Sequence, residues 1–138
     1  MTVVVDASIA VKWFLPELHA EAAQRLLRGK RRLLAPDLIW AEVGNVLWKK
    51  CLRREISTEA AKEILRDFQQ FPIETIGVKE LLDAAWELAE HFHVTVYDSL
   101  YLALAMSQNC SLVTADKSFY DALKGSLAGS LEWVEHIR

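Results

Sequence analysis

The alternation of short apolar runs with helix-length amphipathic segments is the feature that most restricts the fold of this chain. Apolar runs of three to five residues recur along the sequence, and segments with apolar residues at helical spacing separate them. Strands joined through helices run parallel in a sheet, because an antiparallel neighbour needs only a short hairpin. The sequence therefore predicts an α/β fold with a parallel sheet.

Apolar periodicity and capping or turn residues give the expected elements. We expect strands at residues 2–6, 33–35, 73–76, 111–115 and 131–134. We expect helices at residues 7–14, 17–28, 37–53, 57–70, 78–92, 97–107 and 117–124. No repeat or linker interrupts this order, so a single domain is expected over residues 1–138.

Composition indicates a folded chain that also meets a partner. Of the 138 residues, 52% are hydrophobic, which is more than in an ordinary soluble domain, and five are Trp. No signal peptide is visible, and no apolar run approaches the ~20 residues of a membrane span. We therefore expect a cytoplasmic protein outside the membrane, with Cys51 and Cys110 as reduced packing residues.

The net charge of −3 conceals a basic segment. Residues 25–54 carry nine Lys or Arg against two acids, so this segment is +7 and the rest of the chain is −10. Such a cluster is either a solvated helix surface or a track for nucleic-acid phosphates, and an acidic protein would suit the same surface. The candidate contacts are Arg25, Arg28, Lys49, Lys50, Arg53 and Arg54.

Four acids are expected at the carboxyl edge of the sheet. Asp6 and Asp116 end or follow two expected strands, while Glu42 and Asp98 lie near the starts of two expected helices. Binding sites of open parallel sheets form outside the carboxyl ends of the strands. Connectivity alone can therefore bring these four carboxylates together.

Three of these acids also have a local explanation as helix caps. Asp6 and Asp116 each precede a helix, and Asp98 completes a capping box that begins at Thr95. Glu42 lies instead in an apolar stretch of a helix, where a carboxylate requires a partner. Converging carboxylates repel one another, and a hard divalent cation such as Mg²⁺ or Mn²⁺ would stabilise all four together.

Other catalytic signatures are absent from the sequence. It contains no GxSxG, GxGxxG, Walker A or Cys–His signature. His91 and His93 lack a third nearby zinc ligand and are expected at the surface. A haloacid dehalogenase-like phosphatase would need a second acid two residues after Asp6, where this chain has Ser8.

Four segments occur in an order and spacing that together are specific. They read VVDAS from residue 4, APDL from residue 35 with AEV from residue 41, VYDSLY from residue 96, and LVTAD from residue 112. On these motifs, nearly the whole chain resembles PIN-domain ribonucleases of the VapC type, the toxins of toxin–antitoxin pairs. The acids of that family fall on Asp6, Glu42, Asp98 and Asp116.

The resemblance implies a three-layer α/β/α sandwich with a central, mainly parallel five-stranded sheet. It also implies hydrolysis of RNA phosphodiester bonds by water activated by one or two Mg²⁺ or Mn²⁺ ions at the four acids. Ser8 and Thr114 match positions that support the acids. The implied partners are RNA, an antitoxin that fills the active-site groove, and a second copy of the chain.

The sequence leaves three alternatives open. Some relatives carry a further acid after the last motif, where this chain has Lys117, so the site would hold either one ion or two. Trp40 and Trp48, in the helix over residues 38–51, belong either to the core or to a dimer interface. The alternative function is a non-catalytic PIN-like module for RNA binding or assembly.

Overall fold

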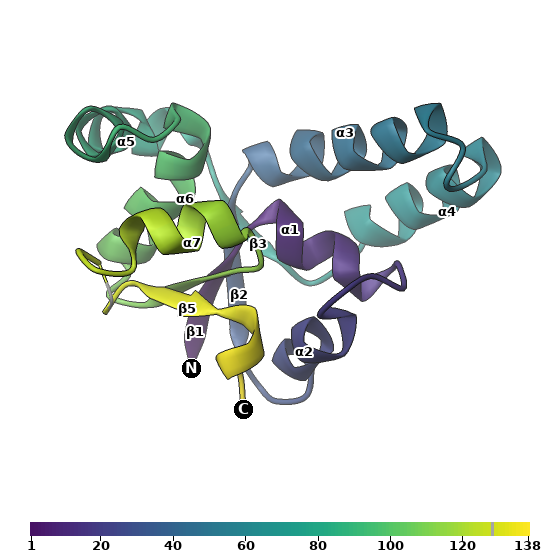
Figure 1. Ribbon diagram of the computed structural model, residues 1–138, viewed down its shortest axis with the longest axis horizontal. Helices are drawn as coiled ribbons and strands as arrows, with labels where there is room; N and C mark the ends of the chain where they lie inside the picture. The colour runs from purple at the N-terminus through teal and green to yellow at the C-terminus, as the bar shows by residue number, and fades with distance from the viewer. Residues whose placement is uncertain (128) are drawn as a thin grey trace.

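Five strands form one parallel sheet in the computed structural model, which describes residues 1–127 and 129–138 (Figure 1). They are β1 (Thr2–Val5), β2 (Arg32–Pro36), β3 (Glu74–Ile76), β4 (Ser111–Thr114) and β5 (Leu131–Trp133). The strand order is β3-β2-β1-β4-β5, and every neighbouring pair is parallel. The predicted α/β class is confirmed, and Asp6 lies directly beyond the end of the central strand.

Helices connect the strands and cover both faces of the sheet. They are α1 (Ala7–Ala10), α2 (Ala20–Gln24), α3 (Leu38–Leu52), α4 (Thr58–Gln69), α5 (Val78–Phe92), α6 (Val96–Ser107) and α7 (Lys117–Leu123). Figure 1 shows α3 and α4 as a helical hairpin on one side of the molecule, with α5 and α6 on the other. Within the described residues, no helix is both long and apolar enough to cross a bilayer.

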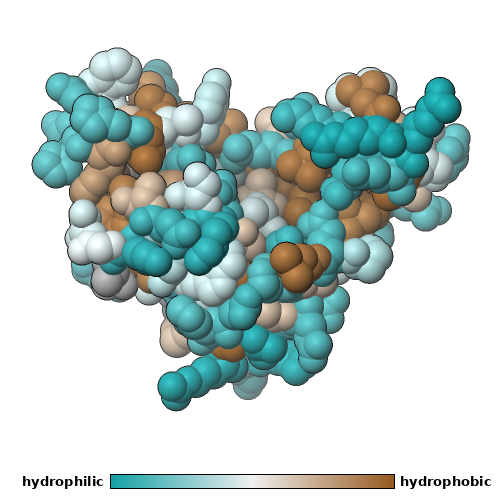
Figure 2. Space-filling view, in the orientation of Figure 1, coloured by the Kyte–Doolittle hydropathy of each residue, from teal (hydrophilic) through white to brown (hydrophobic). Residues whose placement is uncertain are grey.

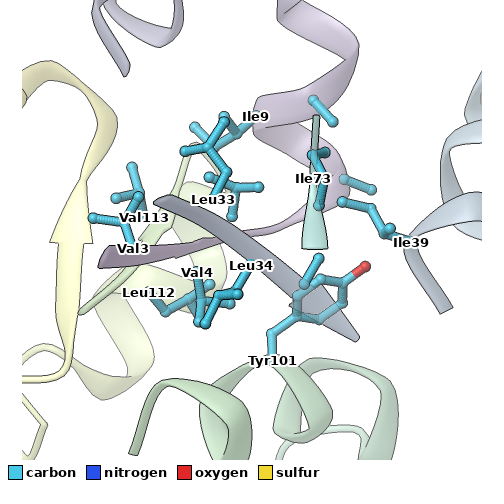
Figure 3. Packing of buried hydrophobic residues seen from close by; sticks show 14 of the residues in the cluster. Val3, Val4, Ile9, Leu33, Leu34, Ile39, Ile73, Tyr101, Leu112 and Val113 are labelled. Atoms are coloured by element: carbon cyan, nitrogen blue, oxygen red, sulfur yellow. The ribbon is translucent and has the colours of Figure 1, made fainter. Parts of the chain in front are cut away.

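Alternate strand residues point to opposite faces of the sheet (Figure 3). One set faces Tyr101 of α6 and consists of Val4, Leu34 and Leu112. The other set faces Ile9 of α1 and consists of Val3, Leu33 and Val113. Because both faces are buried, the strands are almost continuously apolar, which is typical of parallel sheets.

The segment before α2 differs from the prediction. A continuous helix over residues 17–28 is wrong, because α2 begins only at Ala20 and gives way to a 3₁₀ turn after Gln24. His19 has a φ of 65°, a left-handed conformation that cannot continue a helix. The Glu17 carboxylate is instead 2.7 Å from Lys50 Nζ of α3, a long-range contact that holds this loop.

The two Trp residues of α3 have different surroundings. Trp40 is half-buried and packs on Phe68 of α4, with 4.9 Å between ring centroids. Trp48 is 54% exposed. Trp40 therefore belongs to the core, and only Trp48 is accessible to a partner.

Candidate active site

Asp6 is at the centre of the carboxyl edge of the sheet, between β1 and α1. Its Oδ1 accepts hydrogen bonds from Ser8 Oγ at 2.5 Å and from Ile9 N at 3.2 Å. Its Oδ2 accepts from Thr114 Oγ1 at 2.5 Å. Asp6 therefore caps α1, as the local explanation predicted, and three donors also hold its carboxylate in one orientation.

The hydroxyls of Ser8 and Thr114 connect the ends of β1 and β4. Ser8 Oγ accepts a hydrogen bond from Ala115 N, and Thr114 Oγ1 accepts one from Asp116 N, both at 3.0 Å. Each hydroxyl thus accepts from the main chain and gives its own hydrogen to Asp6. Both residues expected to support the acids contact Asp6 directly.

Asp116 is the N-cap of α7, and Asp98 lies in the first turn of α6. Asp116 Oδ1 accepts from Phe119 N at 3.1 Å and caps α7. At α6, Thr95 Oγ1 accepts from Asp98 N at 3.0 Å, so half of the predicted capping box is present. Among the described residues the Asp98 carboxylate accepts no main-chain N–H, so the reciprocal half of the capping box is not formed.

Glu42 of α3 has a partner that the sequence analysis missed. Tyr101 Oη donates to Glu42 Oε1 at 2.6 Å, and the Tyr101 side chain is buried. Burial, followed by the charge of Glu42, raises the pKa of Tyr101, so its hydroxyl stays protonated and donates. Tyr101 is one helical turn after Asp98, and this spacing was the available signal.

Two of the four acids, Asp6 and Asp98, have a raised pKa. Burial raises the pKa of Asp6 to about 6 against the effect of its three hydrogen bonds, and the charge of Asp98 adds to the rise. Burial also raises the pKa of Asp98, with further contributions from the charges of Asp116 and Glu42. Asp98 therefore lies within electrostatic reach of each of the other three acids. None of the four acids forms an ion pair with a Lys, Arg or His in the described part of the chain.

This donor set fits a hard divalent cation. All four side chains offer carboxylate oxygens, and their mutual repulsion is not neutralised by a protein cation. Within residues 1–127 and 129–138, no three His, Cys, Asp or Glu side chains lie close enough together, as they stand, to hold a metal ion. Mg²⁺ is commonly held by one or two carboxylates and several waters, so this open arrangement suits Mg²⁺ or Mn²⁺. His91 and His93 are exposed, as expected.

The basic segment is divided between two places. Lys49, Lys50 and Arg53 line a hollow of about 340 Å³ together with Ser8, beside Asp6. Arg25 and Arg28 instead line a pocket with Met1 and Arg138, beyond the amino ends of the strands. Arg54 is exposed after the end of α3. The predicted basic residues therefore do not form one continuous surface.

Comparisons with known proteins agree with this geometry. The PIN domain profile matches residues 3–124. Ribonuclease VapC3 of Pyrobaculum aerophilum is 34% identical over 119 residues, which are 85% of this chain and 91% of that protein. A crystal structure of a Pyrobaculum aerophilum protein aligns with a TM-score of 0.67 and 25% identity, covering 98% of this chain and 85% of that one. A toxin–antitoxin complex from Klebsiella pneumoniae has a similar fold, with a TM-score of 0.65, 14% identity, and coverage of 94% and 96%.

Proposed function

This chain belongs to the PIN-domain family and is a ribonuclease of the VapC type, and we propose that it hydrolyses RNA with water activated by Mg²⁺ or Mn²⁺. The proposed site consists of Asp6, Glu42, Asp98 and Asp116. The main support is that Asp98 lies within electrostatic reach of the other three acids, with no ion pair to a protein cation in the described part of the chain. Such a set is unfavourable alone and becomes favourable when a divalent ion binds.

Asp6, Asp98 and Asp116 are the proposed ligands of the first ion. When bound, a divalent ion lowers the pKa of a coordinated water and neutralises charge on the phosphate oxygens. The hydroxyls of Ser8 and Thr114 orient the Asp6 carboxylate before any ligand arrives. This orientation reduces the ordering that binding would otherwise require.

Glu42 is proposed to orient the attacking water or to hold a second ion. Tyr101 donates a hydrogen bond to Oε1 of Glu42, and among the described residues Oε2 of Glu42 accepts no hydrogen bond. That second oxygen is therefore able to accept a hydrogen bond from water. Tyr101 acts as a positioning residue, because it acts through Glu42.

RNA is proposed to reach the acids through the hollow beside Asp6. Lys49 and Arg53 line this hollow and form no ion pair in the described part of the chain. Lys50 is partly neutralised, since its Nζ is 2.7 Å from Glu17 and 3.4 Å from Glu55. Phosphate contacts of this kind position RNA without reading its sequence.

An antitoxin and a second copy of this chain are the proposed protein partners, in the cytoplasm. The similar fold of a toxin–antitoxin complex supports the first. Either partner could cover the exposed apolar side chains of α3 and α5. These are Trp48, Leu52, Leu82 and Trp86. Figure 2 shows apolar side chains among polar ones over both helices. Light scattering tests the dimer, and a monomer at micromolar concentration would contradict it.

Two alternative functions have less support. A haloacid dehalogenase-like phosphatase lacks its second acid, because Ser8 occupies that position and donates to Asp6. In a non-catalytic module, four carboxylates without a neutralising protein cation would repel one another and serve no binding role. Titration calorimetry with Mn²⁺ distinguishes the metal-dependent ribonuclease from this module. If the chain is a non-catalytic module, the wild type should bind no Mn²⁺, or Asp98→Asn should bind Mn²⁺ as well as the wild type does.

The products of RNA cleavage test the proposed reaction. End-labelled structured and single-stranded RNAs are incubated with the protein in Mg²⁺ or Mn²⁺, and the new ends are analysed. Attack by water leaves a linear phosphate and a hydroxyl, whereas attack by the RNA 2′-hydroxyl leaves a cyclic phosphate. We expect only linear phosphate ends, and cyclic ends would contradict a metal-activated water. Asp67→Asn, at an exposed position of α4, is the control for Asp98→Asn.

A further inference from the structure

A second cationic pocket lies at the amino edge of the sheet, opposite the four acids. It has a volume of about 390 Å³ and includes Met1, which precedes β1. Its cationic lining consists of Arg25, Arg28, Lys30, Arg31 and Arg138. Figure 1 shows both chain ends at this end of the molecule, away from α3 and α5.

Two of these arginines are held in place by main-chain oxygens. Arg25 Nε donates to Ile137 O at 2.8 Å. Arg31 donates through Nη1 to Arg25 O and through Nη2 to the main-chain oxygen of Arg138, both at 2.9 Å. Ile137 O and Arg25 O are peptide carbonyls without net charge, so these two bonds orient the guanidinium groups without neutralising them.

The positive charge of this pocket has no acidic counterpart. None of its five cationic side chains pairs with Asp or Glu in residues 1–127 and 129–138. By contrast, Arg32 pairs with Glu74, and Lys50 pairs with Glu17. A free carboxylate at residue 138 would offset only one of the five charges. The pocket therefore concentrates positive charge on a chain whose net charge is −3.

We propose that this pocket binds a phosphate of the RNA backbone at a second point, remote from the bond that is cleaved. The inference rests on the proposed ribonuclease function. Asp6 is five residue steps after Met1 along the extended chain of β1, or about 17 Å at roughly 3.3 Å per residue. One phosphate cannot occupy both places, but an RNA of several nucleotides can contact both.

The acidity of the catalytic edge explains why a remote phosphate site is useful. Four carboxylates repel the RNA backbone before an ion binds, so part of the affinity must come from elsewhere on the chain. Guanidinium groups with fixed orientation suit the geometry of phosphate oxygens. Arg25 and Arg31 have this property.

The lining favours RNA over an acidic protein. Protein interfaces usually have an apolar centre, and Met1 is the one large apolar side chain among the residues that line this pocket. Met1 and Leu27 are the exposed apolar residues at or next to this pocket, whereas the exposed Trp side chains lie on other elements, Trp48 on α3 and Trp86 on α5. A backbone phosphate needs only charged donors and no apolar centre.

Two double variants with equal change in charge test the proposal. Arg28→Glu with Lys30→Glu alters the pocket, and Lys62→Glu with Arg66→Glu alters α4. All four side chains are exposed and form no hydrogen bond or ion pair in the described part of the chain, so both proteins should fold. Affinity for a fluorescent structured RNA is measured in EDTA, which prevents metal-dependent cleavage, over a series of salt concentrations.

We expect the pocket variant to lose about 10-fold or more in RNA affinity. The slope of log affinity against log salt should fall by about 1, because one or two phosphate contacts are lost. The α4 variant should lose less than about 2-fold. Equal losses in the two variants, or unchanged affinity in the pocket variant, would overturn the proposal.

Small anions identify the ligand. Inorganic phosphate, followed by NMR, should shift the amide signals of Gly29 and Lys30 saturably and compete with RNA. Phosphate binding without an effect of the pocket variant on RNA would overturn the RNA assignment. Displacement of RNA by an acidic peptide but not by phosphate would indicate a protein partner and would also overturn the assignment of RNA to this pocket. RNA binding through the pocket without metal-dependent cleavage would support this inference and contradict the proposed function.

Discussion

Tyr101 donates its hydroxyl hydrogen to Oε1 of Glu42 across 2.6 Å, and this bond joins α6 to α3 although the residues are 59 positions apart. Tyr101 is one turn beyond Asp98 on the same helix. One helix therefore supplies both an acid of the proposed site and the donor that orients a second acid.

Tyr101→Phe should reduce activity while the protein stays folded. The substitution removes one hydroxyl and keeps the buried ring, so Glu42 loses its donor but the core keeps its packing. Loss of a residue that orients a metal ligand typically costs about 10–100-fold in activity or metal affinity. Steady-state cleavage kinetics and Mn²⁺ calorimetry measure both.

Tyr120→Phe is the matched control for Tyr101→Phe. Its hydroxyl forms no hydrogen bond among the described residues, and its ring packs near Trp133. Equal Mn²⁺ affinity in wild type and Tyr101→Phe, with equal kcat, would show that Tyr101 does not position Glu42.

Thr114→Val should shift the pH dependence of cleavage to higher pH. The Thr114 hydroxyl donates to the charged form of Asp6 and so lowers the pKa of Asp6. Without this donor the pKa rises above about 6, and Asp6 becomes available to a cation only at higher pH. A pH–rate profile checks the shift, with Thr75→Val on exposed β3 as control. An unmoved acidic limb would contradict the role of Thr114.

The metal-free protein should lose stability through Asp6 as pH rises from about 4 to about 6. The folded state holds the Asp6 proton up to about pH 6, whereas the unfolded chain releases it near 3.8, so deprotonation favours unfolding. The difference corresponds to at most about 3 kcal/mol. The raised pKa of Asp98 acts in the same direction.

Comparison with Asp6→Asn isolates this effect. Other carboxylates, such as Glu17, have lowered pKa values and contribute the opposite slope. Urea unfolding in EDTA between pH 4 and 7 should therefore show wild type losing stability relative to Asp6→Asn as pH rises. A constant difference between the two proteins would contradict the raised pKa.

Added Mg²⁺ should stabilise the wild-type fold. An ion that binds only the folded state at 100 times its Kd contributes about 2.7 kcal/mol. Asp98→Asn should lose most of this gain, whereas Asp67→Asn should keep it. Thermal unfolding with Mg²⁺ and then with EDTA measures the effect, and equal gains in both variants would exclude Asp98 as a ligand.

Connectivity was sufficient to predict that Asp6 and Asp116 lie at the same edge of the sheet. Asp6 and Asp116 follow strands that turned out to be neighbours, β1 and β4, and parallel strands end at one edge. Their role as caps was equally visible in the sequence, and both explanations hold for the same side chains. Asp116 caps α7 with Oδ1 and keeps Oδ2 for a ligand, whereas both oxygens of Asp6 already accept hydrogen bonds and offer a ligand only their remaining lone pairs.

Contacts between distant elements could not be predicted in this way. The Tyr101–Glu42 bond depends on how α6 meets α3, and the ion pair of Glu17 with Lys50 depends on how the loop before α2 meets α3. The periodicity of apolar residues within one helix or strand predicts neither of these contacts. For the same reason the basic segment looked continuous in the sequence, whereas β2 and most of α3 separate Arg28 from Lys49.

The most direct test is single-turnover cleavage of end-labelled RNA by wild type and Asp6→Asn in Mg²⁺ or Mn²⁺, with and without EDTA. Asp6 is the central acid, and its carboxylate accepts three hydrogen bonds. We predict cleavage by wild type that both EDTA and Asp6→Asn abolish. Cleavage that survives in Asp6→Asn at the wild-type rate, or that EDTA leaves unchanged, would contradict a metal-dependent reaction at these carboxylates.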